Sequence, residues 1–472
     1  MSGLHDRPWQ PGQLLVVLDI GKSNAKIVLV DPLTGAELAS MRRPNAALQD
    51  GPVRQLDLDG VAGWLLSSLA ALPERQRIAA IAPVAHGAAC VMLAAGGAAV
   101  LAPDYEDPVL ASEPETYDAL RDPFAQSLSP ALPLGLNLGR QIHHVQHRLP
   151  DLFERVASIV PYAQYWAFLL SGIMASEVTS LGCHTDLWWP AQHRFSDLAT
   201  NAGWDRLFAP LRRAGETLGL LRPEIAARCG LPRDCAVLCG IHDSNASYLR
   251  HRMHRPGSDR FAVISSGTWT VLLASNIAGG ALRQDRDMLA NVDAFGALVG
   301  TARFMGGREY VAVAGVEAPP PDWAGLQRAL AADAHVLPGF TVGGQFPDQV
   351  GELVHADGLD ATARAALASF YVALLTDVAL DLLGAGGDVI IDGPLAENPL
   401  FPGLLAGLRD GSAVLLGEDG AGSIGGARCL LLGAGAEPAG LRRPAPCDTR
   451  SLGDTRALVA ARSRWREAVR AR

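Results

Sequence analysis

Residues 14–30 read LLVVLDIGKSNAKIVLV, which is two apolar runs on either side of a short polar turn. The runs have the length and the β-branched content of buried strands. The turn contains Gly21, Ser23 and Asn24, which are residue types that tight turns favour. The stretch therefore predicts a β-hairpin near the start of the first domain.

A second stretch repeats this plan. Residues 261–274, FAVISSGTWTVLLA, place a Ser-Ser-Gly-Thr turn between two apolar runs. Two such hairpins indicate a duplicated architecture in which each half opens with a glycine-bearing hairpin. Predicted strands alternate with predicted helices along the rest of the chain, for example in residues 236–249 and 361–401, which is typical of an α/β protein.

The chain has 472 residues, which exceeds the roughly 100 to 200 residues of a single ordinary domain. The polar, turn-forming run RHRMHRPGSD at residues 250–259 is the best boundary. We therefore expect an N-terminal domain over residues 1–250 and a C-terminal domain over residues 251–472.

Composition excludes several classes of protein. The chain is 49% apolar and 19% charged, with a net charge of −9, so it is globular and repels nucleic acid and anionic membrane surfaces. No apolar run follows a basic start, so we expect a cytoplasmic protein. The charge-free stretch at residues 78–103 is broken by a proline and glycines, which favours buried strands over a membrane span. The seven scattered cysteines are expected to be reduced and buried.

The basic residues are strongly skewed, because only Lys22 and Lys26 are lysines and every other basic residue is arginine. Two lysines in one turn suggest a site that needs a compact ammonium group, although chance clustering on a surface turn is the alternative. With Gly21, Ser23 and Asn24, they are suited to binding phosphate. Asp19 would repel a phosphate unless a divalent cation lay between them, so we expect Mg²⁺ at Asp19.

Five motifs resemble the FGGY carbohydrate kinases of the actin-like ATPase superfamily. DIGKSNAK at residues 19–26 and SSGTWT at residues 265–270 resemble the two phosphate motifs, and GIHD at residues 240–243 is similar to the segment with the catalytic aspartate. IDGPLAENPLF at residues 391–401 resembles an altered adenosine motif, and AGSIGGA at residues 421–427 resembles the last connecting motif. Their order covers nearly the whole chain.

The resemblance implies two actin-like (ribonuclease H-like) lobes with a nucleotide and sugar cleft between them, and use of ATP and Mg²⁺. Asp243 would be the general base that accepts the proton of the attacking hydroxyl group. A helix N-cap is the structural alternative for Asp243. The nucleotide and its phosphates would contact Gly21, Lys22, Ser23, Asn24, Lys26, Ser266, Gly267, Thr268, Gly393, Pro394 and Asn398.

The sugar site has its own candidates. By the resemblance, His86 and Gly87 form a sugar-contacting turn, and His242 lies next to the base, although buried histidines are often only packing residues. Polar residues in apolar runs are the other candidates. These substrate candidates are His86, Gly87, Asn137, Gln141, His242 and Asp243, with Glu177 and Thr179 as further ones that helix capping explains equally well.

The expected activity is transfer of the γ-phosphoryl group of Mg-ATP to a hydroxyl group of a small sugar. The resemblance favours a ketose or deoxyketose such as L-rhamnulose or L-fuculose. The alternatives are a kinase of a pentulose or polyol (xylulose, ribulose or glycerol), a non-kinase actin-like ATPase, and a catalytically silent sugar sensor. The expected partner is the sugar itself, with neither nucleic acid nor membrane, and a homodimer is left open.

Overall fold

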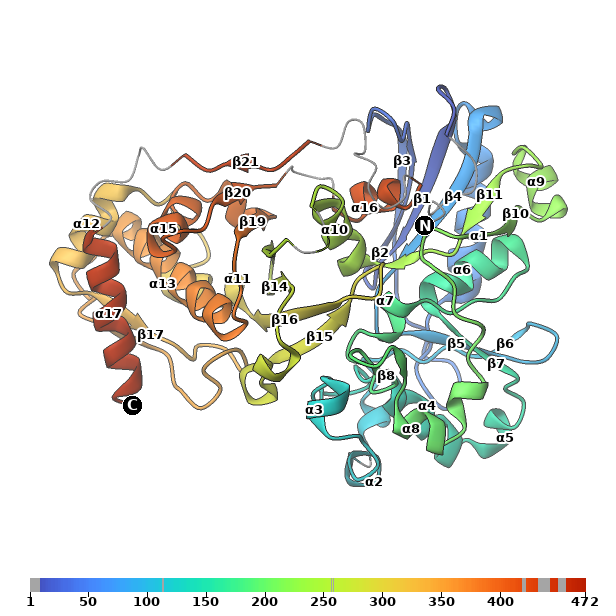
Figure 1. Cartoon of the computed structure of the whole chain (residues 1–472), viewed down its shortest axis with the longest axis horizontal. Helices are drawn as coiled ribbons and strands as arrows, with labels where there is room; N and C mark the ends of the chain where they lie inside the picture. Colours follow the sequence, from blue (N-terminus) through green and yellow to red (C-terminus); the bar gives the residue numbers. More distant parts are fainter. Residues whose placement is uncertain are drawn as a thin grey trace. The chain divides into compact units, whose positions relative to one another are not determined.

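The computed structural model describes residues 9–112, 114–255, 257, 259–417, 422–431, 442–448 and 456–472 (Figure 1). The chain divides into two compact units. Unit 1 consists of Met1–Pro256, Ala290–Leu298 and Ala421–Leu441, and unit 2 of Gly257–Leu289, Val299–Gly420 and Arg442–Arg472. Unit 1 therefore includes two segments from the half of the sequence after residue 250.

Unit 1 is built on a mixed sheet with the order β10-β11-β4-β1-β2-β3, and β12 also pairs with β4. The predicted hairpin is confirmed, because β1 and β2 are antiparallel neighbours. Strands β1, β11 and β12 each run parallel to β4. The bounds are β1 (Leu14–Ile20), β2 (Asn24–Val30), β3 (Glu37–Pro44), β4 (Ile78–Ala85), β10 (Thr217–Leu220), β11 (Ala236–Leu238) and β12 (Ile241–His242).

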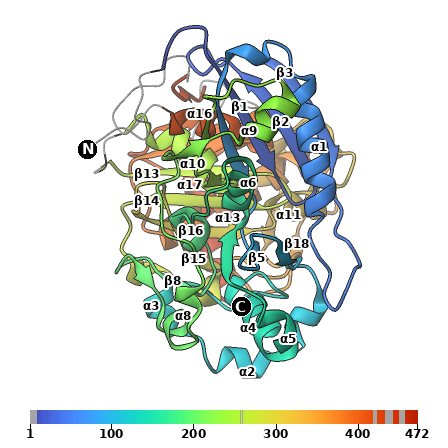
Figure 2. The ribbon, with the colours of Figure 1, turned by 90° about the vertical axis from the view of Figure 1, so that its right-hand side faces the viewer.

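Helices cover both faces of this sheet. Alternate residues of β1 point into two different cores, one shared with α1 (Leu58–Ala71), α6 (Tyr162–Ser171) and α9 (Pro223–Cys229). The other core is shared with α10 (Asp243–Arg252) and α16 (Gly422–Leu430). Helices α10 and α16 lie side by side in Figure 1, and Figure 2 shows α1 along the outer side of the sheet. This double covering explains why β1 is almost uninterruptedly apolar.

The remainder of unit 1 packs around a small antiparallel sheet with the order β6-β5-β7. The charge-free stretch at residues 78–103 forms β4, β5 and β6, and the prediction of buried strands is confirmed for β4 and β5, whereas only Leu101 of β6 is buried. The other elements are β5 (Cys90–Leu93), β6 (Ala99–Leu101), α2 (Pro114–Asp118), α3 (Phe124–Ser127), α4 (Leu138–Arg148), α5 (Pro150–Phe153), β7 (Ser158–Pro161), α7 (Val178–Leu181), β8 (Trp188–Trp189), β9 (Arg194–Phe195) and α8 (Asp197–Asn201).

Unit 2 is built on a second mixed sheet, in which β16-β14-β13-β19-β20-β21 are successive neighbours. The second predicted hairpin is confirmed as β13 and β14, and β19 runs parallel to β13. The strands are β13 (Phe261–Ser266), β14 (Thr270–Ser275), β16 (Leu298–Phe304), β19 (Asp388–Asp392), β20 (Val414–Leu416) and β21 (Ala445–Pro446), and β15 (Met288–Val292) leads from unit 2 back into unit 1. Each sheet thus has a hairpin whose first strand pairs in parallel with a later strand.

A long helix forms the centre of unit 2. Helix α13 (Ala361–Leu382) is long and apolar enough to cross a membrane by composition, but 83% of its apolar window is buried, as in a core helix. It packs against α11, α12 and α15. The remaining elements are α11 (Gly306–Ala314), α12 (Trp323–Ala331), β17 (His335–Leu337), β18 (Glu352–Val354), α14 (Pro394–Glu397), α15 (Phe401–Leu408) and α17 (Arg456–Arg470).

Candidate active site

Three strand ends meet at one edge of the sheet in unit 1. In the ladder between β1 and β4, Asp19 lies opposite Val84, one residue before Ala85. His242, at the end of β12, lies opposite Ala85 itself. Because these strands are parallel, their carboxyl ends bring Asp19, His86 and Asp243 together, which is where α/β sheets commonly bind ligands.

Asp243 is the first residue of α10, and its side chain remains one-third exposed. Its Oδ1 atom accepts hydrogen bonds from the backbone N–H (2.6 Å) and the hydroxyl group (3.3 Å) of Ser244. The N-cap position belongs to His242, and no side-chain capping bond is formed there, so capping does not account for Asp243. Although part of the side chain is exposed, the protein atoms packed around the carboxyl group desolvate it and so raise the pKa of Asp243, and a raised pKa makes a carboxylate a better proton acceptor.

His242 is held on several sides. Its Nε2 atom lies 3.2 Å from Oδ1 of Asp243, and its Nδ1 atom lies 3.1 Å from the side-chain nitrogen of Asn245. Its backbone N–H donates to the hydroxyl oxygen of Thr179 at 3.1 Å. A Cβ atom on Gly87 would lie 2.7 Å from Nε2, so glycine at position 87 makes room for the imidazole. Burial lowers the pKa of His242 to about 4, so the ring is neutral near pH 7.

Glu177 and Thr179 stand behind His242. Oε2 of Glu177 accepts from the backbone N–H groups of Thr179 and Ser180 and from the hydroxyl group of Thr179, the last at 2.5 Å. Both side chains are fully buried. Burial raises the pKa of Glu177 to about 7. Glu177 therefore caps α7, as the alternative interpretation holds, and also orients the hydroxyl group that contacts His242.

His86 lies among aromatic rings. Its ring centroid is 4.9 Å from that of Tyr162 and 5.8 Å from that of Tyr105. Its Nδ1 atom is 2.9 Å from the carbonyl oxygen of Gly87, which favours a proton on Nδ1. Burial lowers the pKa of His86, so it is also neutral. The site thus combines neutral polar groups with flat apolar surfaces, a combination that suits a polyol.

The first phosphate loop is a tight turn pinned by a residue outside it. The Gly21 N–H donates to the Asn24 carbonyl group at 2.9 Å, which closes the turn. Asn45, just after β3, donates its backbone N–H to the Ser23 carbonyl group and its side-chain amide to the Gly21 carbonyl group. Sequence reasoning missed Asn45, because nothing in its local sequence connects it to a loop twenty residues earlier.

The two lysines of this segment differ in their surroundings. The Lys22 ammonium group lies 2.6 Å from Oδ1 of Asp104 and 3.3 Å from Glu106, and it also lies over the Tyr105 ring. Lys26 is 3.7 Å from the half-exposed Glu37. Arg54 adds a second cation beside Asp104, at 2.7 Å. Lys22 is therefore part of a compact ion-pair cluster at the loop.

Asp19 fits the role of a metal-binding carboxylate. Its Oδ2 atom accepts a hydrogen bond of 2.6 Å from the hydroxyl group of Ser423 on α16. Burial, with a smaller contribution from the charge of Asp243, raises the pKa of Asp19. A divalent cation near Asp19 would relieve both effects, and Mg²⁺ typically takes one or two carboxylates and completes its shell with water and phosphate.

The second predicted phosphate loop, in unit 2, also lies at the carboxyl ends of two parallel strands. Ser265 lies opposite Asp392 in the parallel pair of β13 and β19, so Ser266 and Gly393 meet at the carboxyl ends. The Ser266 hydroxyl group donates to the Asp392 carbonyl group (2.7 Å) and accepts from the Leu395 N–H (3.0 Å). Gly393 has φ +80°, and a Cβ atom there would lie 2.3 Å from the Ser266 carbonyl oxygen.

The other predicted residues of unit 2 lie around this junction. The carbonyl group of Thr268 accepts from the Gly307 N–H at the start of α11, and a Cβ atom on Gly307 would come within 2.6 Å of the Gly267 carbonyl oxygen. Pro394 begins α14. The Asn398 side chain donates to Ser369 and accepts from two backbone N–H groups at the start of α15. The Asn398 side chain therefore has a structural role.

Two predicted sugar contacts are structural in the same way. The side chain of Asn137 is fully buried, accepts from the Leu132 N–H and donates to oxygen atoms of the surrounding loops, among them the carbonyl groups of Pro130 and His184. Gln141, also fully buried, donates to the carbonyl groups of Ala88 and Gly135. Polar residues within apolar runs are here explained by loops whose backbone groups they satisfy. Contact of either side chain with a sugar stays a prediction.

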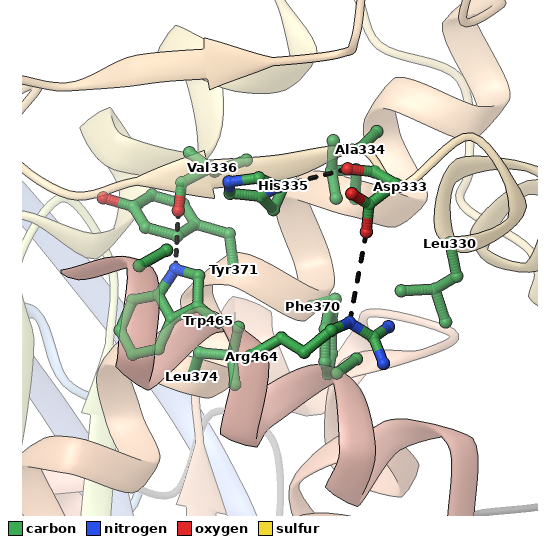
Figure 3. Close-up of a pocket in the computed structure, with 13 residues that line it drawn as sticks. Leu330, Asp333, Ala334, His335, Val336, Phe370, Tyr371, Leu374, Arg464 and Trp465 are labelled. Atoms are coloured by element: carbon green, nitrogen blue, oxygen red, sulfur yellow. Dashed lines mark hydrogen bonds and ion pairs between the residues drawn. The ribbon is translucent and has the colours of Figure 1, made fainter. Parts of the chain in front are cut away.

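A small apolar cavity lies elsewhere, inside unit 2. Its volume is about 110 Å³, and it is lined by β17, α13 and α17 (Figure 3). Trp465 closes one side and donates its indole N–H to the Val336 carbonyl group at 2.6 Å. None of the predicted site residues lines this cavity.

Comparison with known proteins identifies the family of the chain. The structure of a carbohydrate kinase from Novosphingobium aromaticivorans superposes with a TM-score of 0.86 at 36% identity, over 97% of this chain and 99% of that one. Residues 258–439 match the family model described as carbohydrate kinase FGGY, C-terminal domain. The chain belongs to the FGGY carbohydrate kinase family. The two-domain mixed α/β fold of that family, predicted from the motifs, is therefore confirmed.

Two curated relatives of this FGGY-family chain match shorter regions. L-fuculokinase from Haemophilus influenzae is 29% identical over 142 residues, which is 28% of each chain. Rhamnulokinase from Oceanobacillus iheyensis is 24% identical over 184 residues, 36% of this chain and 37% of that protein. The chain thus aligns with roughly a third of the length of these relatives.

Proposed function

We propose that this chain is an ATP-dependent sugar kinase in which Asp243 is the general base. The observation that supports this proposal most directly is the convergence of Asp19, His86 and Asp243 on three parallel strand ends of unit 1. Family membership supports the phosphotransferase class. ATP is the proposed phosphoryl donor, and the phosphate loops and the Gly393 turn are the proposed nucleotide contacts.

In the proposed reaction, Asp243 accepts the proton of a sugar hydroxyl group while the oxygen atom attacks the γ-phosphorus of ATP. The bond between the γ-phosphorus and the β–γ bridging oxygen breaks, and ADP leaves with that bridging oxygen. The partly exposed Asp243 can reach a substrate, and its raised pKa favours proton transfer near neutral pH. Mg²⁺ bound near Asp19 would neutralise phosphate charge.

We infer that the acceptor is a neutral ketose or deoxyketose, phosphorylated at its primary hydroxyl group. L-fuculokinase and rhamnulokinase are named for such sugars, and His86 and His242 are neutral hydrogen-bonding groups. The cation next to the Tyr105 ring, Lys22, is already paired with two carboxylates, which disfavours a sugar acid. A cytoplasmic location fits a substrate that ATP phosphorylates.

The test is a measurement of ADP release with ATP and Mg²⁺, with and without a panel of L-rhamnulose, L-fuculose, xylulose, ribulose, glycerol and gluconate. We expect release that depends on a ketose. Sugar-independent release would identify an ATPase, and sugar binding without release would identify a sensor. A wide preference for glycerol or gluconate would overturn the ketose assignment while leaving the kinase class intact.

A further inference from the structure

Behind the proposed base lies a buried chain of hydrogen bonds that ends on His242. It begins at the Glu177 carboxylate, passes through the Thr179 hydroxyl group, and reaches the His242 backbone N–H. A hydroxyl group has one proton to give. Because the Thr179 hydroxyl donates to Glu177, its oxygen lone pair is left to accept from His242. The His242 backbone N–H can only donate, so the direction of its bond to Thr179 is fixed, and with Glu177 ionised the Thr179 hydroxyl group donates to the carboxylate.

The tautomer of His242 follows from its two neighbours. Its Nε2 atom lies 3.2 Å from the Asp243 carboxylate. An unprotonated Nε2 would place a lone pair against a carboxylate oxygen, so the proton of the neutral ring belongs on Nε2. Nδ1 is then an acceptor, which matches the side-chain nitrogen of Asn245 at 3.1 Å. Asn245 is 1% exposed, so water does not readily replace its amide.

Gly87 completes the arrangement, because the imidazole fills the space in which a side chain at position 87 would lie. His242 is thus fixed at its backbone by Thr179, at Nδ1 by Asn245 and at its edge by Gly87. Asp243 is the next residue along the chain, and its carboxylate has few partners of its own beyond Ser244. Whatever fixes His242 therefore fixes the backbone that carries the carboxylate.

We propose that Asn245, Thr179 and Glu177 are positioning residues that hold neutral His242 with its Nε2–H beside the Asp243 carboxylate and so set the orientation of the general base. This inference rests on the proposed function. The pKa of His242, lowered to about 4 by burial, agrees with a ring that stays neutral throughout the working pH range. Asn245 acts on the tautomer, whereas Thr179 and Glu177 act on the backbone.

The inference predicts distinct effects of two substitutions. Asn245→Ala removes the donor to Nδ1, so the ring can move its proton between the two nitrogens. Thr179→Val keeps the shape of the side chain but removes the acceptor of the His242 N–H. Because misplacement of a reacting group by about 1 Å can cost up to 10²-fold, we expect kcat to fall about tenfold or more in each, with the KM for ATP changed by less than about twofold.

Thr179→Ser should restore kcat to within about threefold of wild type, because serine keeps the hydroxyl group. Thr376→Val is the matched control: Thr376 is a fully buried threonine of α13 in unit 2, and its hydroxyl group donates only to the Val372 carbonyl group four residues earlier. Thr376→Val therefore measures how much kcat falls when a buried threonine is replaced with valine at a position that does not contact His242.

The closing experiment records the ¹⁵N chemical shifts of the histidine rings in selectively labelled full-length protein, with His242 assigned by difference from His242→Gln. We expect His242 to carry its proton on Nε2 in the wild type, and Asn245→Ala to lose this preference. A wild-type His242 protonated on Nδ1 would overturn the inference. So would Asn245→Ala and Thr179→Val proteins that lose no more kcat than Thr376→Val. If the wild type phosphorylates no sugar, the proposed function fails, and the ring shifts alone still decide how His242 is held.

Discussion

The Lys22 ammonium group lies 2.6 Å from Oδ1 of Asp104, a carboxylate with no solvent exposure. This pair connects the first phosphate loop to the segment after β6, and Arg54 contacts the same carboxylate from another side. A buried carboxylate needs close, well-placed cations. The skew toward arginine elsewhere in the chain makes lysine at this position informative, because a compact ammonium group contacts both Asp104 and Glu106 here, and a guanidinium differs from it in size and shape.

Replacing Lys22 with arginine should therefore lower turnover by about tenfold or more, although the positive charge is kept. Lys26→Arg is the comparison variant: Lys26 is also a predicted phosphate contact, but it is 3.7 Å from a half-exposed Glu37 and not in the ion-pair cluster of Asp104, so a smaller loss is expected. Steady-state kinetics with varied ATP, together with melting curves, check both variants. Equal kinetics for Lys22→Arg and wild type would favour the alternative that the two lysines lie close together by chance.

The general base can be tested with Asp243→Asn. The variant keeps an oxygen atom to accept the Ser244 N–H but loses the basic site, so kcat should fall about 10²- to 10⁴-fold with little change in melting temperature. Asp197→Asn is the control, because Asp197 is likewise the first residue of a helix in unit 1. A near-normal kcat in Asp243→Asn would contradict the proposal that Asp243 is the general base.

Ser423 offers a test of the metal site. Its hydroxyl group donates to Oδ2 of Asp19, and such bonds from outside the metal shell orient the liganding carboxylate. Ser423→Ala should weaken the apparent affinity for Mg²⁺ about 10- to 100-fold, measured by titrating activity with Mg²⁺ at fixed ATP. Ser423→Thr, which keeps the hydroxyl group, should behave like wild type. An unchanged Mg²⁺ requirement in the alanine variant would argue against Asp19 as the metal-binding carboxylate.

Gly393 and Gly411 form a matched pair in unit 2. Both have positive φ, +80° and +85°, so alanine is strained at either; with ψ −165°, Gly393 lies in a region essentially restricted to glycine, where the strain is about 1 to 3 kcal/mol. Only at Gly393 would the added Cβ atom also collide with backbone, the Ser266 carbonyl group, whereas Gly411 has open space. We expect the melting temperature to fall clearly further in Gly393→Ala than in Gly411→Ala. We also expect Gly393→Ala to bind ADP more weakly, as measured by calorimetry. Equal effects would show that the Ser266–Gly393 junction tolerates movement.

Glu177 makes the free energy of unfolding depend on pH. Burial raises its pKa from 4.5 to about 7, so between these pH values the native protein retains a proton that the unfolded chain has lost. The stability of the wild type should therefore fall as the pH rises through this window and then level off. In Glu177→Gln this fall should be absent. Between pH 5 and a pH above 7, the wild type should therefore lose free energy of unfolding on the order of 3 kcal/mol more than the variant does. Denaturant unfolding at pH 5, 6, 7 and 8 checks it, and parallel curves for the two proteins would contradict it.

Much of this arrangement could be predicted from local sequence. Both hairpins follow from apolar runs around a polar turn, and Asp19 and Asp243 stand where such runs end. Strand ends are readable because the change from apolar to polar residues is abrupt there. For Asn137 and Gln141 the same signal is ambiguous, since a polar residue in an apolar run can equally well satisfy buried loop backbone, and their sugar contacts stay a prediction.

The residues that sequence reasoning missed act from a distance. Asn45 reaches back to the loop of β1 and β2, and Ser423 reaches Asp19 across some four hundred residues of sequence. Their roles depend on the order of strands in the sheet and on which helices cover it, and neither is encoded in a short window. Asn245 follows Asp243 closely, but its role could not be predicted from the sequence, because its contact with His242 depends on the ring's orientation.

The discontinuity of unit 1 has a consequence for synthesis on the ribosome. Helix α16 packs so closely on α10 that a Cβ atom on Gly426 would overlap the Ala246 carbonyl oxygen, yet nearly all of unit 2 is translated between them. A nascent chain that has emerged as far as residue 256 has α10 but lacks α16, so one face of its central sheet is only partly covered and Asp19 has not met Ser423. Unit 1, the first to leave the ribosome, is thus completed only when α16 has been made, and until then it exposes apolar surface that chaperones recognise.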